Sequence, residues 1–462
     1  MLEPSDSEEA RQFAALAFDL SEKYDTPILY KMCTRVSHSQ SIVETAERKE
    51  PVHKPYTKDI SKYVMAPANA IRRHPFVEQR MKDIEEWSCT SGINRIEDAG
   101  TQVGIITSST SYQYTKEVLG DKVSILKLGM VNPLPAKLVR EFAKNKKTLI
   151  IIEELDPIIE NFVRALNLPA TIYGKDIFPI CGEFSQNLLR ECLSKIDEVK
   201  GFISGSNSSA NELKTLDCDL PKRPPIMCAG CPHRGMFYAL NKLKVTVFGD
   251  IGCYTLGSVA PLSAMDVTLC MGASFSGLHG WNKAGGSENE KKSVAVIGDS
   301  TFVHSGMTGL AQIAYNQSNS TVIVLDNSIT GMTGHQQNPT TGKNLYGEPA
   351  GRIDLEALAR AMGINRVRVV DPYNIADCET AVREELAVEE PSLIISRRPC
   401  ALLKEVKHNP PLKVDESKCK SCKMCMKIGC PAISMKDGKA KIDVTLCMGC
   451  GVCSQMCKFG AL

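Results

Sequence analysis

The stretch "SVAVIGDSTFVHSGMTGLAQIAYNQSNSTVIVLDNSIT", residues 293–330, decides the fold class of this 462-residue chain. It contains two short apolar runs, "SVAVI" and "TVIVL", and a helical stretch joins them. Apolar runs without polar alternation, interleaved with helices, are typical of parallel strands that are buried on both faces. We therefore expect two neighbouring parallel strands, with Asp299 at the end of the first and Asn327 at the end of the second.

Parallel strands end at the same edge of a sheet, so the oxygens of Asp299 and Asn327 are expected to point into one crevice. Such oxygens suit Mg²⁺, and oxygens of a diphosphate would complete its coordination. The pattern resembles the thiamine-diphosphate motif, in which GDG is followed by NN on the next strand. By that resemblance the carbonyl of Ile329 is a further metal ligand, and Gly298 and Ser300 lie against the phosphates. The alternative is an aspartate and an asparagine that merely end two strands.

The C-terminal segment 412–462 holds two copies of a cysteine repeat, and both follow the C-x2-C-x2-C-xn-C spacing of bacterial ferredoxins. In such domains three cysteines of one copy share a cluster with the last cysteine of the other copy. One 4Fe–4S cluster is therefore assigned to Cys419, Cys422, Cys425 and Cys457, and the other to Cys447, Cys450, Cys453 and Cys430. The segment between the copies is predicted to be a hairpin that turns at Asp437-Gly438. Zinc is the alternative, but zinc takes four ligands, and eight cysteines in two interlocked triplets fit two clusters better.

Four further motifs lie in the same region as Asp299 and Asn327: "CAGCPHR" (228–234), "GDIGCYTLG" (249–257), "CMGAS" (270–274) and "MTGHQ" (332–336). Together with the cysteine tail and an early "CTRVSHS" (33–39), they closely resemble the alpha subunit of the indolepyruvate:ferredoxin oxidoreductase family, within the 2-oxoacid:ferredoxin oxidoreductase superfamily. The resemblance covers essentially the whole chain.

This resemblance implies a thiamine-diphosphate-binding fold and the oxidative decarboxylation of aryl 2-oxoacids such as indolepyruvate and phenylpyruvate. Coenzyme A would take the acyl group, carbon dioxide would leave, and the electrons would pass through the clusters to ferredoxin. The resemblance also implies a second subunit, of beta or gamma type. Two alternatives stay open: a different 2-oxoacid, either pyruvate or a branched-chain acid, and a truncated, non-catalytic electron-transfer subunit.

Several residues inside these motifs are weaker candidates for the site. His233 and Arg234 are candidates to bind the diphosphate or a substrate carboxylate. His304 and His335 are candidate proton donors, and Gly272 is a candidate for cofactor binding. The alternative for His233 and Arg234 is a capping or surface pair after Cys-Pro, and the alternative for His304 and His335 is a purely structural role.

Cys228, Cys231 and Cys253 raise the question of a third 4Fe–4S cluster, with Cys400 or Cys270 as its fourth ligand. Related pyruvate:ferredoxin oxidoreductases bind such a cluster next to thiamine. The alternative is that these cysteines are small buried residues that pack beside the cofactor. The sequence leaves both interpretations open.

The predicted architecture consists of doubly wound, parallel-sheet α/β domains at 101–203 and 222–406, followed by the α+β ferredoxin-like domain at 412–462. Residues 65–100 are polar and are predicted to be a linker. Segment 1–64 is interpreted as the remnant of the pyrimidine-binding domain with which the family opens. Because that domain supplies the glutamate that activates thiamine, we expect the isolated chain to be catalytically incomplete.

Composition excludes several classes of protein. The chain has 55 basic and 53 acidic residues, a formal charge of +2, which gives no electrostatic case for nucleic acid or an anionic membrane as partner. No apolar run approaches the roughly 20 residues of a membrane span, and the acidic start is not a secretory signal. We therefore expect a cytoplasmic protein, in which the 19 cysteines serve metal binding or catalysis more often than disulfides.

Overall fold

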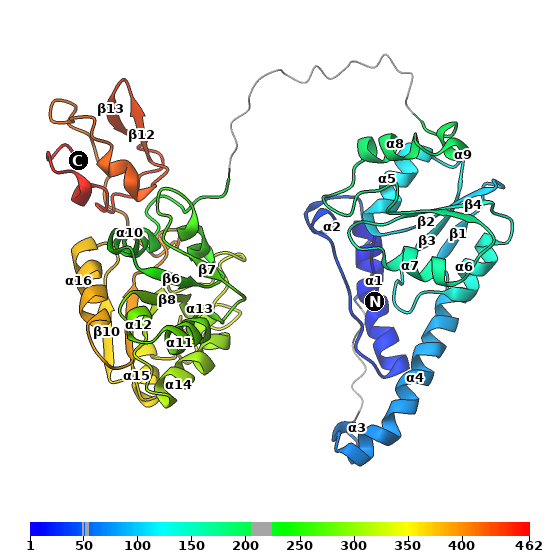
Figure 1. The fold of residues 1–462 in the computed structure, drawn as a ribbon, viewed down its shortest axis with the longest axis horizontal. Helices are drawn as coiled ribbons and strands as arrows, with labels where there is room; N and C mark the ends of the chain where they lie inside the picture. The colour runs from blue at the N-terminus through cyan, green and yellow to red at the C-terminus, as the bar shows by residue number, and fades with distance from the viewer. Residues whose placement is uncertain (49, 51–54, 205–223) are drawn as a thin grey trace. The chain divides into compact units, whose positions relative to one another are not determined.

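A computed structural model describes residues 1–48, 50, 55–204 and 224–462 of the chain. The chain divides into two compact units, Met1–Cys218 and Asp219–Leu462. Each unit contains a largely parallel β-sheet with helices on both faces (Figure 1). None of the helices in the described ranges is both long enough and apolar enough to cross a membrane.

The first unit is built on a five-stranded sheet in the order β1-β3-β2-β4-β5. Strands β2 to β5 run parallel, and β1 pairs antiparallel with β3. The three central strands are buried along their whole length, which explains their uninterrupted apolar sequences. The strands are β1 (Arg95–Glu97), β2 (Val103–Ser108), β3 (Ser124–Leu128), β4 (Thr148–Ile152) and β5 (Thr171–Tyr173).

Helices cover both faces of this sheet, because neighbouring residues of each central strand point to opposite faces. Ile105 packs in one core cluster with residues of α5 and α8, whereas Ile106 packs in another with residues of α6 and α7. The helices of the unit are α1 (Ser7–Tyr24), α2 (Thr34–His38), α3 (Ile60–Tyr63), α4 (Pro67–Thr90), α5 (Ser109–Leu119), α6 (Ala136–Ala143), α7 (Ile158–Ala165), α8 (Gln186–Leu193) and α9 (Asp197–Lys200).

The prediction of a linker at 65–100 is wrong, because α4 fills most of that segment with 24 helical residues. Pro67 stands at the start of the helix, where its missing N–H costs nothing. Ile84 and Ser88 are its buried residues, so most of the helix faces solvent. A polar composition with a narrow buried stripe resembles a linker in sequence although it folds as a helix.

The N-terminal segment packs on the sheet of the same unit and does not form a separate body. Its apolar side chains share one core cluster with α4, the loop before β1 and the residues after β3. That cluster contains Leu2, Phe13, Leu20, Ile84, Ile93 and Met130.

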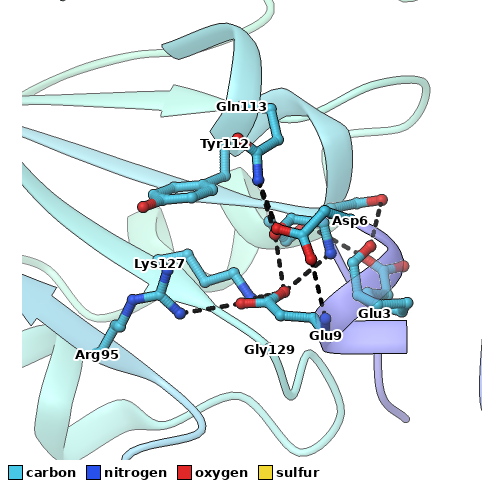
Figure 2. A network of polar contacts seen from close by, with 12 residues as sticks. Glu3, Asp6, Glu9, Arg95, Tyr112, Gln113, Lys127 and Gly129 are labelled. Carbon is cyan, nitrogen blue, oxygen red and sulfur yellow. Dashed lines mark hydrogen bonds and ion pairs between the residues drawn. The ribbon is translucent and has the colours of Figure 1, made fainter. Parts of the chain in front are cut away.

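A buried ion pair fixes α1 to the sheet (Figure 2). The Glu9 carboxylate accepts hydrogen bonds from Lys127 Nζ at 2.5 Å and from Arg95 Nη1 at 3.0 Å. The N–H and the hydroxyl of Ser5 donate to the same carboxylate at 2.9 and 2.8 Å. Burial raises the pKa of Glu9, but the attraction of Lys127 and these hydrogen bonds outweigh burial and lower the pKa to about 2.

We expect the first unit to lose stability in acid because of Glu9. The folded-state pKa is depressed, so the stabilisation is complete above the ordinary value of 4.5 and is lost as the pH falls toward 2. The shift corresponds to about 3 kcal/mol. Urea unfolding across this pH range, followed by the fluorescence of Trp87 in a Trp281→Phe background, measures the effect. A Glu9→Gln variant should show a flatter acid dependence, and equal slopes for the two proteins would contradict the assignment.

The second unit is built on a six-stranded, all-parallel sheet in the order β10-β11-β9-β8-β6-β7. Strands β8 and β9 are buried along their whole length. The strands are β6 (Thr246–Gly249), β7 (Val267–Thr268), β8 (Ser293–Gly298), β9 (Thr321–Asp326), β10 (Arg366–Val370) and β11 (Ser392–Arg397).

Its two faces carry separate cores, so the expected doubly wound α/β fold is confirmed. Val294 and Val296 pack in one cluster with α10 and α16, whereas Ala295 and Ile297 pack in another with α11, α14 and α15. The helices are α10 (His233–Leu243), α11 (Ser274–Gly285), α12 (Ser287–Glu290), α13 (Asp299–Thr301), α14 (Met307–Tyr315), α15 (Leu355–Ala361) and α16 (Ile375–Leu386).

The tail of the second unit is a small domain made of one hairpin and two short 3₁₀ turns. Its hairpin consists of β12 (Ile433–Lys436) and β13 (Lys439–Ile442), which pair antiparallel. Asp437 and Gly438 turn the chain with φ values of 50° and 73°, the conformation that an Asp-Gly turn favours. Short 3₁₀ turns at Met424–Ile428 and Ser454–Met456 lie within the two cysteine repeats.

Candidate thiamine and iron–sulfur site

The ends of β8 and β9 lie side by side at one edge of the sheet. Gly298 is the register partner of Leu325, so Asp299, directly after β8, lies beside Asp326, the last residue of β9, and Asn327 follows that residue. The hydroxyl of Thr330, in the loop after β9, donates to Ser300 Oγ at 2.9 Å. The structure therefore brings the two loops together at the edge where the sequence predicts a metal–diphosphate site.

Asp299 is held by two residues that the sequence analysis missed. Its Oδ2 accepts hydrogen bonds from Asn338 Nδ2 at 3.2 Å and from Thr340 Oγ1 at 3.0 Å. Burial, reinforced by the nearby charge of Asp326, raises the pKa of Asp299 to about 7. A buried carboxylate beside a second carboxylate is stabilised by a cation, so this residue fits a ligand of Mg²⁺.

Asn327 is fixed on three sides. Its Nδ2 lies 3.4 Å from Nε2 of His233, and its Oδ1 accepts from the N–H of Ile329 at 3.4 Å. Its carbonyl accepts from the N–H of Cys400 at 2.8 Å. Burial lowers the pKa of His233 to about 4, so this imidazole is neutral at pH 7. His233 therefore contacts a candidate metal ligand but is not a cation for phosphate.

The loop before α11 forms a cradle of small residues. Gly272 has a φ of 90°, and a Cβ there would overlap Ser305 Oγ. The hydroxyls of Ser274 and Ser305 are buried and have no hydrogen-bond partner within the described part of the chain. Unpaired buried donors beside a glycine turn fit a group rich in acceptor oxygens, such as a diphosphate.

Asp250 is a further residue that the sequence analysis did not single out. It is fully buried, and its carboxylate accepts from the N–H groups of Gly272 at 2.8 Å and Ser274 at 3.1 Å. It thus holds the cradle against the end of β6. The signal was present, because Asp250 directly follows a strand in the same way as Asp299.

The other candidate histidines lie near the same edge but are exposed. His304 belongs to a π-helical turn, Phe302–Gly306, directly after α13. Such turns are frequent at functional sites. His335 lies in the loop after β9 with a φ of 62°. Their role as proton donors stays a prediction.

Arg234 has different partners from those expected. Its Nη1 donates to the carbonyls of Ile428 at 3.1 Å and Gly429 at 2.6 Å, in the tail. Its Nε donates to the carbonyl of Cys228 at 3.2 Å, and Nη2 donates to the same carbonyl and to that of Met227. All five N–H positions are thereby engaged by backbone. The guanidinium connects the tail to the start of α10, in place of the anion-binding role that the sequence suggested.

Four cysteines converge beside Asn327; we call Cys228, Cys231, Cys253 and Cys400 the inner group. Burial raises the pKa of Cys231 to about 12, and the thiols of Cys228 and Cys400 reinforce the rise. Burial and the same two thiols also raise the pKa of Cys253. Cys400 therefore accompanies the other three, whereas Cys270 of the loop before α11 is not among the thiols that raise the pKa of Cys231 or Cys253.

The inner group adjoins the strand ends directly. A Cβ on Gly331 would lie 3.5 Å from Cys253 Sγ and 3.9 Å from Asn327 Nδ2. The hydrogen bond from Cys400 to Asn327 makes a second connection.

The tail cysteines fall into two further groups. The outer group, Cys419, Cys422, Cys425 and Cys457, lines one cavity whose other lining residues are mostly apolar. The middle group is Cys430, Cys447, Cys450 and Cys453. Burial raises the pKa of Cys453 to about 12, and the thiols of Cys450, Cys430 and Cys447 reinforce the rise. Both groupings cross between the two repeats in the way that the ferredoxin spacing predicts.

Within the described ranges, no three His, Cys, Asp or Glu side chains converge closely enough to hold one metal ion. Cysteines at the corners of an iron–sulfur cube each bind a different iron and stand further apart than the ligands of one ion. The assignment of the tail cysteines to clusters therefore rests on the ferredoxin spacing of the two repeats.

Two family models match this part of the chain. The C-terminal TPP binding domain of thiamine pyrophosphate enzymes matches residues 250–396, and a 4Fe-4S binding domain matches residues 440–462. The fold and its strand-edge site therefore define a thiamine-diphosphate enzyme domain that is joined to an iron–sulfur domain.

Curated relatives identify the particular family. The indolepyruvate oxidoreductase subunit IorA of Pyrococcus horikoshii is 38% identical over 498 residues, which cover 100% of this chain and 76% of the relative. The proteins of the same name from Thermococcus kodakarensis and Archaeoglobus fulgidus are 38% and 35% identical, and the chain covers 77% and 75% of them. The chain belongs to this IorA family. It is an oxidoreductase that acts on an oxo group with an iron–sulfur protein as acceptor.

One solved structure, a 2-oxoglutarate:ferredoxin oxidoreductase from Magnetococcus marinus, aligns with 40% of this chain and 68% of its own. The identity is 18% and the TM-score is 0.35.

We expect Thr340→Val to weaken the binding of thiamine diphosphate in the presence of Mg²⁺ by about 10–100-fold, as is usual when an outer partner of a metal ligand is lost. The valine keeps the shape but cannot donate to Asp299. Calorimetric titration measures the affinity. Thr333→Val is the matched control, because Thr333 is exposed and donates to Gln336 of the same loop. Equal affinities in the two variants would show that the hydrogen bond from Thr340 to Asp299 does not support cofactor binding.

Proposed function

We propose that this chain, together with a second subunit of beta or gamma type, catalyses the oxidative decarboxylation of aryl 2-oxoacids such as indolepyruvate and phenylpyruvate. In the balanced reaction, a 2-oxoacid anion, coenzyme A and two oxidised ferredoxins give an acyl-coenzyme A, carbon dioxide, one proton and two reduced ferredoxins. The observation that carries the proposal is the 35–38% identity to IorA proteins over 99–100% of this chain.

Mg²⁺ would be held by Asp299, Asn327 and the carbonyl of Ile329, at the shared edge of β8 and β9. Gly298, Ser300 and Gly272 would lie against the diphosphate. A Cβ on Gly298 would stand 2.5 Å from the ring of Tyr254, so only glycine fits there. Thiamine diphosphate, when bound, supplies a carbanion that adds to the ketone and an electron sink for the loss of carbon dioxide.

The histidines at this edge would orient a metal ligand and exchange protons with the substrate. His233 is neutral and lies against Asn327, so it would fix the orientation of that ligand. His304 and His335 are exposed at the same edge and would exchange protons with the substrate side.

Electrons would leave through three 4Fe–4S clusters, of which the third would occupy the inner group. Support for the third cluster comes from two observations. The four inner cysteines influence one another electrostatically, and Cys400 and Cys253 adjoin Asn327. Packed free thiols would not require four cysteines from three separate loops to converge. The middle and outer groups would then conduct the electrons toward ferredoxin, in a cytoplasmic setting that keeps the thiols reduced.

An anaerobic ferredoxin-reduction assay of the chain with its second subunit tests this function. We expect reduction that depends on coenzyme A and is at least tenfold faster, in kcat/KM, with indolepyruvate or phenylpyruvate than with pyruvate or a branched-chain 2-oxoacid. Asp299→Ala should abolish substrate-driven reduction while dithionite still reduces the clusters. Preference for pyruvate would overturn the aryl assignment. If substrate-driven reduction is unchanged in Asp299→Ala, the thiamine site does not depend on this residue, and only a role in electron transfer is left for this chain.

A further inference from the structure

The tail is docked to the thiamine-binding domain through a small set of buried contacts, and Arg234 stands in the middle of them. Arg234 is the second residue of α10 and is 4% exposed. One side of its guanidinium is bonded to the carbonyl of Cys228, in the inner group. The other side is bonded to the carbonyls of Ile428 and Gly429, directly before Cys430 of the middle group.

Glycines allow the two loops to come this close. Gly429 has a φ of 66°, and a Cβ there would lie 3.3 Å from Arg234 Nη1. Gly230, between Cys228 and Cys231, also has a φ of 66°, and a Cβ there would lie 2.8 Å from Met448 of the tail. Larger residues at either position would push the inner and middle groups apart.

A second connection lies beside the first. The hydroxyl of Tyr373 donates to the carbonyl of Gly230 at 2.5 Å, and the backbone carbonyl of Tyr373 accepts from Gln455 Nε2 of the tail at 2.6 Å. Arg398 lies over the Tyr373 ring at 4.1 Å and is paired with Asp371 at 2.7 Å. The charge of Arg398 is therefore balanced by a carboxylate.

Unlike Arg398, Arg234 donates no hydrogen bond to a carboxylate in the described ranges. Its acceptors in the described ranges are four backbone carbonyls, and none is a carboxylate. Burying a cation without a counter-ion costs free energy, so we expect negative charge close to Arg234. Iron–sulfur cubes with four thiolate ligands carry net negative charge, and cysteine groups lie on both sides of the guanidinium.

The charged and titratable groups around Arg234 also place it between the inner and the middle group. Burial lowers the pKa of Arg234, and the thiols of Cys231, Cys430, Cys228 and Cys450 act in the opposite direction. Cys228 and Cys231 belong to the inner group, and Cys430 and Cys450 belong to the middle group. Arg234 therefore lies between the two groups in its electrostatic contacts as well as in its hydrogen bonds.

We propose that Arg234 is a positioning and tuning residue of the electron path. It holds the inner and middle cysteine groups together, and its unbalanced positive charge raises the reduction potential of the clusters on either side. The proposal rests on the proposed iron–sulfur function. Each electron that enters a neighbouring cluster increases its negative charge, so a fixed cation stabilises the reduced form more than the oxidised form. The electron path thereby becomes easier to reduce next to the thiamine site.

Redox titration followed by electron paramagnetic resonance, on the chain assembled with its second subunit, tests the proposal. Arg234→Gln removes the charge, and we expect at least a tenfold weaker reduction of the nearest cluster, a shift of about 59 mV to more negative potential for a one-electron couple. Arg234→Lys keeps the charge and should stay closer to wild type. Arg360→Gln is the control for a lost charge, because Arg360 donates to the carbonyl of Asn365, next to the start of β10 and thus at the opposite edge of the sheet.

The titration distinguishes a tuning role of Arg234 from a purely structural role and from a failure of the proposed function. Unchanged potentials in Arg234→Gln, at wild-type iron content, would overturn the proposal. If Arg234→Gln fails to retain iron, wild-type iron in Arg234→Lys supports the role of the charge, and equal loss in both variants overturns it. Absence of any iron–sulfur signal in the wild-type protein would instead refute the proposed function.

Discussion

The site depends on one constraint, which is that parallel strands end at the same edge of a sheet. Strands β6, β8, β9 and β11 all run in one direction, so the loops that follow them meet. Those loops carry Asp250 and Cys253, Asp299, Asn327, and Cys400, respectively. The hydrogen bond from the N–H of Cys400 to the carbonyl of Asn327 joins the thiamine side of this edge to its cysteine side. An antiparallel arrangement would have sent half of these residues to the far edge.

From this edge outward, the inner, middle and outer cysteine groups follow one another in the second unit, and in the proposed function they would carry the electrons. The inner group lies against Asn327, and the tail is held against the inner group by Arg234 and Tyr373. The tail is therefore docked through buried contacts and is more than a domain on a tether. Fixed distances favour electron transfer, because a docked cluster needs no search before each step. The first unit has its own buried anchor, Glu9 with Lys127, which ties its N-terminal helix to its sheet.

The sequence predicts those parts of the site that depend on local spacing. Asp299 and Asn327 each follow an apolar run, and the tail cysteines repeat at fixed intervals, so both could be recognised without a structure. Asn338 and Thr340 could not, because they belong to an irregular loop whose path depends on tertiary contacts. Arg234 stands out in the sequence as a candidate anion binder, whereas its hydrogen bonds in the structure go to backbone carbonyls. Its partners at 428 and 429 are nearly two hundred residues away, and nothing in "CAGCPHR" indicates that they are carbonyls. The segment 65–100 reads as a linker in the sequence because a mostly exposed helix such as α4 has the composition of a linker.

The most direct test of the account is an anomalous-difference map at the iron absorption edge, from crystals of anaerobically prepared protein. The account predicts three iron peaks in series: one within the inner group beside Asn327, one within the middle group and one within the outer group. Two peaks confined to the tail would contradict the continuous path, because electrons would then have to cross from the strand edge to Cys430 without a relay at Cys228, Cys231, Cys253 and Cys400.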